Sequence, residues 1–453
     1  MCGIIGVFNN KRSAELATLG LFAEQHRGQE SCGMAVNSGT TIKLRKKMGL
    51  VKEVFNPHKL DFLKGHIAIG HVRYPTRGAS SIYNSQPHIV ETLSGPSYAL
   101  TSNGDIVNYA ELRKELEEKG VYFASSNDGE LLIKYIVYHV EKENYSITDA
   151  IKQLMKNVKG AYSSILATKT EMYTFRDPYG FRPLSYGKTK EGTFVVASES
   201  CALDILYMDW IKEVEPAEIL ICCNNDIKSI HQNPNDFRET KTNRHCIFEH
   251  IYFSRPDSFI FGENVYKVRE KIGSQLAKAD DLKPDAVVPV PDSSNFIALG
   301  YAKQKGVPFE FGLIRNHYVG RTFIKPEQTI RDESVYQKFN VLPNFFEGKK
   351  IVLIDDSIVR GTTIRKLVKM IKEAGANEVH VRIGSPPVKF SCFYGIDTPT
   401  REELIANNKS IKKIREFIGA DSLKYLEIDD LRKTVSKPQD YCCACFDGNY
   451  PVR

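Results

Sequence analysis

The sequence predicts a two-domain α/β protein whose second half contains a doubly wound parallel sheet. Residues 351–354, Ile-Val-Leu-Ile, are uniformly apolar, which is typical of a strand buried on both faces of a parallel sheet. After a polar loop, apolar residues recur at helical spacing between Ile364 and Ile371, which predicts a helix. Residues 285–294 form a second apolar run that ends in polar residues. Two such strands place two loops at the same carboxyl edge of one sheet.

The length and the composition agree with two large domains. A chain of 453 residues corresponds to about three domains of average size, but α/β folds often exceed that average. The 42% hydrophobic content is enough to supply a substantial core for each of two domains. The segment 223–245 is strongly polar and is the expected junction. We therefore expect one domain at residues 1–235 and the other at 236–453.

The charge and hydropathy patterns exclude several classes of protein. A net charge of +7 is mild and spread along the chain, so it suits anionic phosphate substrates without indicating nucleic-acid binding. The sequence has no apolar run of transmembrane length and no signal peptide pattern, so we expect no membrane partner. The expected location is the cytoplasm.

The loop at 355–363 carries the groups that a ribose 5-phosphate ligand requires. Asp355 and Asp356 directly follow the strand, where carboxylates can accept hydrogen bonds from a ribose diol and help to hold a divalent cation. Gly361, Thr362 and Thr363 stand where the helix begins, and the free N–H groups and dipole at a helix N-terminus bind phosphate. The alternative is an ordinary strand-loop-helix with solvated aspartates, which the order of these residues disfavours.

The start of the chain indicates nucleophilic chemistry. Met1 is followed by Cys2, and removal of Met1 before this small residue would leave Cys2 with a free α-amine. An α-amine with a pKa of about 7.7 to 8.0 and a thiol with a pKa of about 8.5 are well matched for proton transfer. Cys2 could therefore attack an amide carbonyl without a distant histidine as base.

Residues 351–363 resemble the phosphoribosyl-diphosphate binding motif of the type I phosphoribosyltransferases. The resemblance implies that residues 285–294 form the loop on the pyrophosphate side, with Ser293 as an additional contact to Mg²⁺ beside the two aspartates. The basic segment 315–331 can be a lid that excludes water from the reactive C1 centre, or else a solvated surface loop. The implied residues of the phosphoribosyl-diphosphate site are Asp355, Asp356, Ser357, Arg360, Gly361, Thr362 and Thr363.

Five short motifs, at 24–30, 70–74, 102–108, 127–130 and 176–183, resemble the class II glutamine amidotransferases, whose nucleophile is N-terminal. That resemblance implies a four-layer αββα Ntn-hydrolase domain. In it Cys2 is the nucleophile, Asn103 and Gly104 form the oxyanion hole, and Arg73 and Asp128 bind the two charged groups of glutamine. The structural alternatives are a turn at Asn103-Gly104 and a scaffold ion pair at Arg73. The chain departs from the family pattern at Pro75, Ser102, Gly129 and Ser294.

The combination of the two sets of motifs covers nearly the whole chain and resembles the amidophosphoribosyltransferase family. It implies that glutamine, 5-phosphoribosyl 1-diphosphate and water react to give 5-phosphoribosylamine, glutamate and pyrophosphate, the first committed step of purine synthesis. It also implies Mg²⁺ as cofactor, inhibition by purine nucleotides and a homotetramer. Two alternatives stay open: a different class II amidotransferase, and a non-catalytic purine-responsive regulator that keeps only the phosphoribosyl site.

Ten cysteines in a cytoplasmic chain favour metal binding or reactivity over disulfides. Cys442 and Cys445 form a Cys-x-x-Cys motif, whose register is ambiguous because Cys443 is adjacent. Resemblance to the iron-sulfur-containing branch of the family adds Cys246 and Cys392, and four thiolates suit a [4Fe–4S] cluster. Zinc is the alternative metal. The remaining cysteines fall in apolar or small-residue stretches, as buried structural thiols do: Cys32, Cys201, Cys222 and Cys223.

Overall fold

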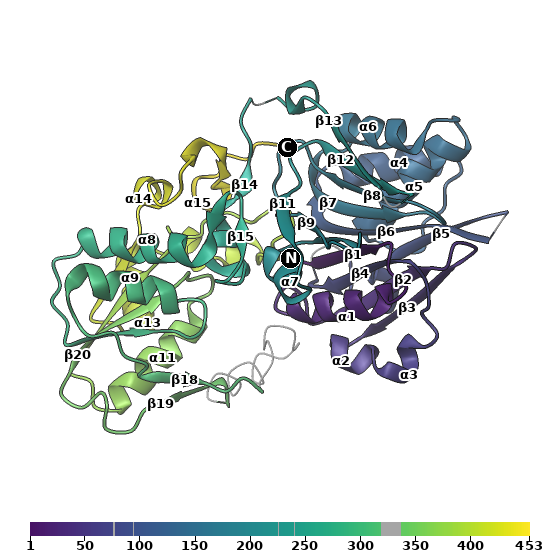
Figure 1. Ribbon diagram of the computed structural model, residues 1–453. Coiled ribbons are helices and arrows are strands. Elements are labelled where there is room, and N and C mark those ends of the chain that lie inside the picture. Colours follow the sequence, from purple (N-terminus) through teal and green to yellow (C-terminus); the bar gives the residue numbers. More distant parts are fainter. Residues whose placement is uncertain (76–77, 94, 225, 240, 319–336) are drawn as a thin grey trace.

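The computed structural model describes residues 1–75, 78–93, 95–224, 226–239, 241–318 and 337–453. Figure 1 shows two lobes, with the N-terminus at the boundary between them. The first lobe contains strands β1 to β13, and the second lobe contains the elements from β14 onward. The start of the chain therefore lies where the two lobes meet.

The first lobe is built on two stacked antiparallel sheets. The first sheet has seven strands in the order β11 (Trp210–Glu213), β9 (Ser185–Lys188), β10 (Phe194–Ala197), β1 (Gly3–Phe8), β4 (Ile67–Arg73), β2 (Ser31–Asn37) and β3 (Ile42–Met48). The second has six, in the order β13 (Asp226–His231), β12 (Glu218–Cys223), β8 (Met172–Arg176), β7 (Gly160–Ala167), β6 (Gly95–Ile106) and β5 (His88–Thr92).

Three apolar cores separate four layers in this lobe. The central core joins the inner faces of the two sheets, for example Ile4 of β1 with Ile165 of β7. One outer core packs α1 (Ser13–Ala23), α2 (Val51–Val54) and α7 (Ser200–Ile205) on the seven-stranded sheet. The other packs α4 (Tyr109–Glu118), α5 (Asp128–Glu141) and α6 (Ile147–Asn157) on the six-stranded sheet. The order helix, sheet, sheet, helix is the expected αββα arrangement. The short helix α3 (Pro57–Leu60) follows α2.

The second lobe contains the expected doubly wound parallel sheet, in the order β17 (Ala286–Pro289), β20 (Lys350–Asp355), β21 (Glu378–Ile383) and β22 (Ser422–Tyr425). One face is covered by α8 (Val265–Lys278) and α9 (Asn295–Lys305). The other is covered by α11 (Thr362–Glu373) and α13 (Ile411–Ile418). Because β17 and β20 are neighbours, the loops that follow them lie side by side at the carboxyl edge.

The polar segment 223–245, the expected junction, contains a strand of the first lobe. Residues Asp226–His231 form β13, which pairs with β12 at the edge of the six-stranded sheet. Most β13 side chains are exposed. Because this edge strand is largely exposed to solvent, its composition is as polar as that of a linker. The first described element of the second lobe is β14 (His245–Cys246), which pairs in parallel with β23 (Tyr441–Cys442).

The remaining elements of the second lobe are short. Within the described residues they are a π-helix, η3 (Glu249–Phe253), the strands β15 (Phe259–Ile260), β16 (Glu263–Asn264), β18 (Leu313–Arg315) and β19 (Phe339–Val341), the α-helices α12 (Ile405–Asn408), α14 (Ile428–Arg432) and α15 (Ala444–Asp447), and the 3-10 helices η5 (Arg401–Glu403) and η6 (Pro438–Asp440). Residues 319–331 of the expected lid lie outside the described residues. Among the helices of the described ranges, none is long and apolar enough to span a membrane.

Candidate active sites

Cys2 is buried immediately before β1, next to a backbone turn that follows β4. Its backbone nitrogen donates to Oδ1 of Asn103 at 3.1 Å, its Sγ lies 3.6 Å from the carbonyl oxygen of Tyr74, and its own carbonyl accepts from Nε of Arg27 at 2.9 Å. Burial raises the pKa of the Cys2 thiol, although the charge of the chain's amino terminus opposes the rise. The residue is therefore held at its nitrogen, its carbonyl and its sulfur, and the thiol needs a nearby base to become nucleophilic.

Asn103 and Gly104 lie together on β6 beside this thiol. Because Oδ1 of Asn103 accepts from Cys2, its Nδ2 points elsewhere, and among the described residues that buried amide nitrogen has no hydrogen-bond partner. Gly104 is pressed against the neighbouring strand: a Cβ at this position would overlap the carbonyl of Ala161 on β7. A free side-chain amide next to a closely packed glycine is consistent with the expected oxyanion hole and not with a turn, because both residues lie within a continuous strand.

Arg73 and Asp128 are both buried near the Cys2 thiol, and the charge of each affects its pKa. Arg73 ends β4 and forms an ion pair with Glu30, so the scaffold ion pair is real. Arg73 also reaches the carbonyl oxygen of Gly78 at 3.4 Å. Asp128 opens α5, where a carboxylate is favoured by the helix dipole. The two opposite charges beside one thiol suit the two charged ends of an amino acid.

Two of the departures from the family pattern share one neighbour, Gln86. Its side chain accepts from the backbone nitrogen of Ser102 at 2.7 Å and donates to the carbonyl of the same residue at 3.2 Å. A Cβ at Gly129 would come within 2.8 Å of the Gln86 side chain. The Gln86 amide is therefore bonded to β6 and fills the space in which a larger residue at 129 would stand.

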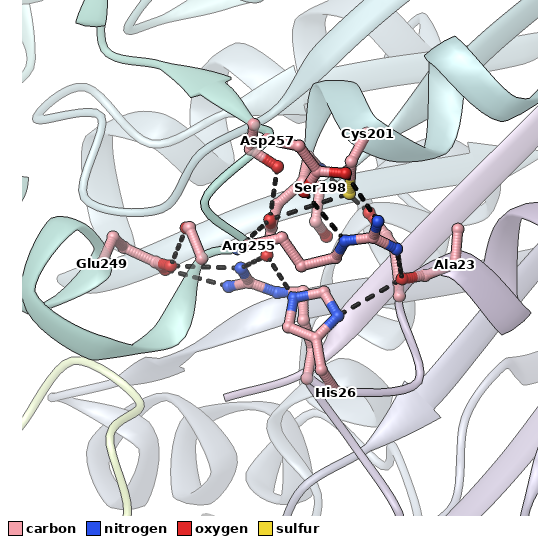
Figure 2. A network of polar contacts seen from close by, with 12 residues as sticks. Ala23, His26, Ser198, Cys201, Glu249, Arg255 and Asp257 are labelled. Carbon is pink, nitrogen blue, oxygen red and sulfur yellow. Dashed lines mark hydrogen bonds and ion pairs between the residues drawn. The ribbon is translucent and has the colours of Figure 1, made fainter. Parts of the chain in front are cut away.

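A fully buried polar cluster joins this site to the second lobe. Nη1 of Arg27 forms an ion pair with Glu199 of the first lobe. The same guanidinium reaches Glu249 of the π-helix η3 at 2.9 and 3.1 Å. Burial alone would raise the pKa of Glu249, but the charge of Arg27 and its hydrogen bonds hold that pKa below the usual range. Figure 2 shows Glu249 and His26 approaching the cluster from different lobes.

Glu199 makes the reciprocal contact, from the first lobe onto the second. One carboxylate oxygen accepts from the backbone nitrogen of Arg255 at 2.8 Å and from the hydroxyl of Ser258 at 2.7 Å. Each lobe therefore sends one buried carboxylate into the other. These contacts hold the segment 249–258 of the second lobe against Glu199 and Arg27, and Arg27 in turn binds the Cys2 carbonyl.

At the carboxyl edge of the parallel sheet, the loops after β17 and β20 meet. Oγ of Ser293 donates to Asp356 at 2.5 Å, and Oγ of Ser294 donates to Asp355 at 3.2 Å. Burial, together with the Asp356 charge, raises the pKa of Asp355 well above its usual range. Burial also raises the pKa of Asp356, partly offset by hydrogen bonds from Ser293 and Ser357. Two adjacent buried carboxylates of this kind are stabilised by a cation.

The helix that follows this loop begins as expected. Gly361 has a φ of 78°, in the left-handed region, which glycine adopts without strain, and α11 starts at Thr362. The N–H groups of the first turn therefore face the loop that carries the two aspartates. Arg360 pairs with Glu403 at 3.2 Å, and among the described residues its buried Nε has no hydrogen-bond partner.

The four expected cluster cysteines come together at the end of the second lobe nearest the first. Cys246 lies directly opposite Cys442 in the parallel β14–β23 bridge. Burial raises the pKa of Cys445 well above its usual range, and the charges of Cys246, Cys442 and Cys392 raise it further. Mutual effects of this kind occur only between groups that lie close together.

Cys443 has a different environment. Burial raises its pKa to about 12, and the charges of Arg432 and Asp447 affect that pKa more than the charge of Cys246 does. In the described part of the chain, no group of three or more His, Cys, Asp or Glu side chains is arranged so that it could hold a metal ion.

Comparisons with known proteins agree with this two-site arrangement. A family model described as a glutamine amidotransferase domain matches residues 79–204, and one described as a phosphoribosyl transferase domain matches residues 262–383. The chain is 46% identical over 455 residues to amidophosphoribosyltransferase 1 of Arabidopsis thaliana, covering all of this chain and 79% of the relative. The chain belongs to the amidophosphoribosyltransferase family. The amidophosphoribosyltransferase of Bacillus subtilis is 43% identical over 456 residues, covering 100% of this chain and 94% of that one.

Solved structures match over the same length. The glutamine phosphoribosylpyrophosphate amidotransferase of B. subtilis, complexed with ADP and GMP, matches with a TM-score of 0.91 at 42% identity. The match covers 100% of this chain and 98% of the B. subtilis chain. A structure described as the allosteric regulatory enzyme of purine biosynthesis also has a TM-score of 0.91, at 43% identity, covering 100% and 96%. The expected function is confirmed: the chain is an amidophosphoribosyltransferase, a pentosyltransferase with a glutamine amidotransferase domain.

Sequence reasoning missed the residues that connect the amidotransferase lobe to the rest of the enzyme. Arg27, Glu199 and Glu249 form the buried cluster. Arg27 lies within the motif 24–30 and Glu249 lies three residues after Cys246, but the sequence assigned a role to none of the three charges. The available signal was weak. Glu249 stands in the run Cys-Ile-Phe-Glu-His-Ile-Tyr-Phe at 246–253, where a carboxylate among apolar neighbours requires a buried partner.

Proposed function

We propose that Cys2, freed of Met1, releases ammonia from glutamine. The α-amine accepts the thiol proton, and Sγ attacks the side-chain amide carbon to give a tetrahedral intermediate. Nδ2 of Asn103 and the backbone N–H of Gly104 stabilise the oxyanion. The α-ammonium then returns its proton to the leaving nitrogen, so collapse of the intermediate breaks the C–N bond, expels ammonia and leaves a glutamyl thioester. Water hydrolyses the thioester to glutamate and regenerates the Cys2 thiol. Arg73 and Asp128 bind the α-carboxylate and the α-ammonium of glutamine.

One observation carries this proposal: Nδ2 of Asn103 has no hydrogen-bond partner among the residues that the structure describes. The same side chain accepts from the Cys2 nitrogen through Oδ1, so the amide is oriented by the residue whose reaction it assists. A buried amide donor without a partner costs free energy, about 1–3 kcal/mol. That cost is offset when an oxyanion forms beside it.

In the second lobe, ammonia attacks C1 of phosphoribosyl diphosphate with inversion, and pyrophosphate leaves from the opposite face. Asp355 and Asp356 accept hydrogen bonds from the ribose hydroxyls. Ser357, Arg360 and the first turn of α11, from Gly361 to Thr363, bind the 5-phosphate. Because free ammonia is protonated at cellular pH and the amine product is short-lived, a closed passage between the two sites is part of the proposal.

Mg²⁺ fits the residues present. Asp355, Asp356 and Ser293 offer the hard oxygen ligands that this ion prefers, and proteins hold Mg²⁺ through one or two carboxylates together with substrate phosphates. A complete cage of protein side chains is therefore not needed. When bound, the ion would neutralise the charge that develops on the departing pyrophosphate.

A [4Fe–4S] cluster fits the four gathered cysteines. Each thiolate in such a cluster binds a different iron, so the ligands stand farther apart than around a single ion. We assign Cys246, Cys392, Cys442 and Cys445 as ligands. Cys443 is left out because the charges of Arg432 and Asp447 act on it more strongly than any of the other thiols does.

The cluster assignment predicts about four iron and four acid-labile sulfide atoms per chain in anaerobically purified protein. Cys445→Ser should lower solubility and stability before it alters either reaction, because the cluster is structural. Cys443→Ser is the matched control and should have a mild effect. One equivalent of zinc, or no metal, would contradict the assignment. A severe effect of Cys443→Ser would mean that Cys443, and not Cys442, is the cluster ligand.

Further parts of the proposal concern regulation and assembly. The B. subtilis relative was solved with ADP and GMP, which supports inhibition of this enzyme by purine nucleotides. We also propose a homotetramer and a cytoplasmic location.

A single assay separates the proposal from its alternatives. Glutamine, phosphoribosyl diphosphate and Mg²⁺ are incubated with the enzyme, and glutamate and pyrophosphate are measured together. Equal amounts of both are expected. A different class II amidotransferase would produce glutamate without pyrophosphate, and a non-catalytic regulator would produce neither.

A further inference from the structure

Glu249 is shared by two arginines of the first lobe, each of which also holds a backbone carbonyl near the glutamine site. Arg27 contacts Glu249 at 2.9 and 3.1 Å and donates from Nε to the carbonyl of Cys2 at 2.9 Å. Arg182 lies 3.6 Å from Glu249 and donates from Nε to the carbonyl of Tyr394 at 2.9 Å. The side chains of Arg27, Arg182 and Glu249 are all fully buried.

The first of these contacts orients the nucleophile. A guanidinium is planar and its five N–H groups stand in a fixed fork, so a carboxylate that holds both Nη atoms also sets the direction of Nε. In Arg27 that direction leads to the carbonyl of Cys2, which is separated from the thiol by only a few covalent bonds. Glu249 thereby limits rotation of the Cys2 backbone.

The second contact reaches the oxyanion hole. Gly395 follows Tyr394, and its backbone packs on that of Gly104: a Cβ at Gly395 would lie 2.8 Å from the carbonyl carbon and oxygen of Gly104. Arg182 fixes the Tyr394 carbonyl, so it fixes the loop that presses on Gly104. Phe181, the residue before Arg182, stacks on the ring of Tyr394 with 4.3 Å between the ring centroids, which further fixes the position of the Tyr394 loop.

We propose that Glu249, a residue of the second lobe, is a positioning residue for glutamine hydrolysis in the first. It acts through Arg27 on Cys2 and through Arg182 on the backbone behind Gly104. Its neighbours Ile251 and Phe253 belong to the apolar core of the phosphoribosyltransferase lobe, so the second lobe sets the geometry of the glutamine site. This inference rests on the proposed roles of Cys2, Asn103 and Gly104.

The test is Glu249→Gln, which keeps the volume and one acceptor oxygen but removes the charge. The kcat of glutamine hydrolysis should fall at least about ten-fold, because small displacements of reacting groups can cost up to about 100-fold in rate. The KM for glutamine should change by less than about three-fold, since a uniform binding loss would appear in KM and Arg73 and Asp128 are untouched. Ammonia-dependent synthesis should keep at least about half of its rate, because no group of the acceptor site is altered.

Glu213→Gln is the matched control. Glu213 is a half-buried carboxylate of the interface, and it accepts from the backbone nitrogens of Phe261 and Gly262, but it contacts neither Arg27 nor Arg182 in the described structure. It should lower stability without changing either activity. Equal loss of both activities in Glu249→Gln, or an unchanged glutaminase kcat, overturns the inference.

Ser254→Ala is a milder variant for the case in which Glu249→Gln does not fold. Oγ of Ser254 donates to Glu249 at 2.8 Å, so its removal loosens the carboxylate without removing the charge. A selective fall of glutaminase kcat supports the inference, and an unchanged kcat overturns it. Failure of the proposed function is distinguishable, because Cys2→Ala would then keep its glutaminase activity. An inactive Cys2→Ala beside a fully active Glu249→Gln overturns the positioning role alone.

Discussion

Replacing Cys2 by alanine is expected to lower glutamine-dependent synthesis of phosphoribosylamine by at least about 1,000-fold, because loss of a covalent nucleophile removes the whole thioester route. The acceptor site is untouched. High ammonium at alkaline pH, where more of the free amine exists, should restore synthesis with phosphoribosyl diphosphate and Mg²⁺. Pyrophosphate release, measured with each nitrogen source, checks both statements. A folded variant without ammonium rescue would show that Cys2 matters beyond glutamine hydrolysis.

A variant that retains Met1 tests the base. With Met1 in place, the Cys2 nitrogen is an amide and cannot accept a proton, and the Met1 side chain is fully buried beside Arg182. Glutaminase activity should therefore be lost although the thiol is present, and ammonia-dependent synthesis should persist. Mass spectrometry identifies the first residue of each preparation. Normal glutaminase activity with Met1 retained would refute the terminal-amine mechanism.

The double variant Asp355→Asn with Asp356→Asn is expected to lower phosphoribosylamine synthesis by at least about 100-fold with either nitrogen source, because charge that stabilises the transition state is lost. Asparagine keeps the size of the side chain and removes both buried charges, so Mg²⁺ and the ribose diol lose their partners. Slow glutamine hydrolysis should remain. Synthesis and hydrolysis are measured on the same preparation.

Asp285→Asn is the matched control for that variant. Asp285 accepts from the backbone nitrogen of Lys350 at 2.7 Å, at the opposite end of the same two strands. It should leave synthesis near the wild-type rate. Unimpaired synthesis in the double variant would end the assignment of the two aspartates.

The parts of the structure that sequence could predict depend on short-range patterns. The strand that ends at Asp355, the place of Gly361 at the start of the helix and the helix from Thr362 follow from residues that are close in sequence. The four-layer fold of the first lobe came from motif resemblance and not from periodicity, because strands such as β2 and β4 are buried along their whole length. A strand buried on both faces shows no alternation.

The polar contacts between the lobes could not be predicted in the same way. Arg27 and Glu249 are separated by 222 positions, and Arg182 and Tyr394 by 212. Nothing in the local pattern around either arginine identifies its partner. Likewise, Cys246 faces Cys442 through a bridge between two strands of two residues each, which is too short to leave a periodic signal.

The reciprocal carboxylates also limit how this enzyme can change over evolution. Glu199 and Glu249 each cross into the opposite lobe, so neither lobe is a self-contained module. A chimera that joined the first lobe to a different acceptor domain would take Glu249 from Arg27 and leave Glu199 as its carboxylate partner, and removing one partner of a buried ion pair costs about 3–5 kcal/mol. That cost is a large share of the stability of a typical domain. Recombination between amidotransferases should therefore succeed only where the donor supplies a matching acidic residue, and the two lobes are expected to have been inherited together.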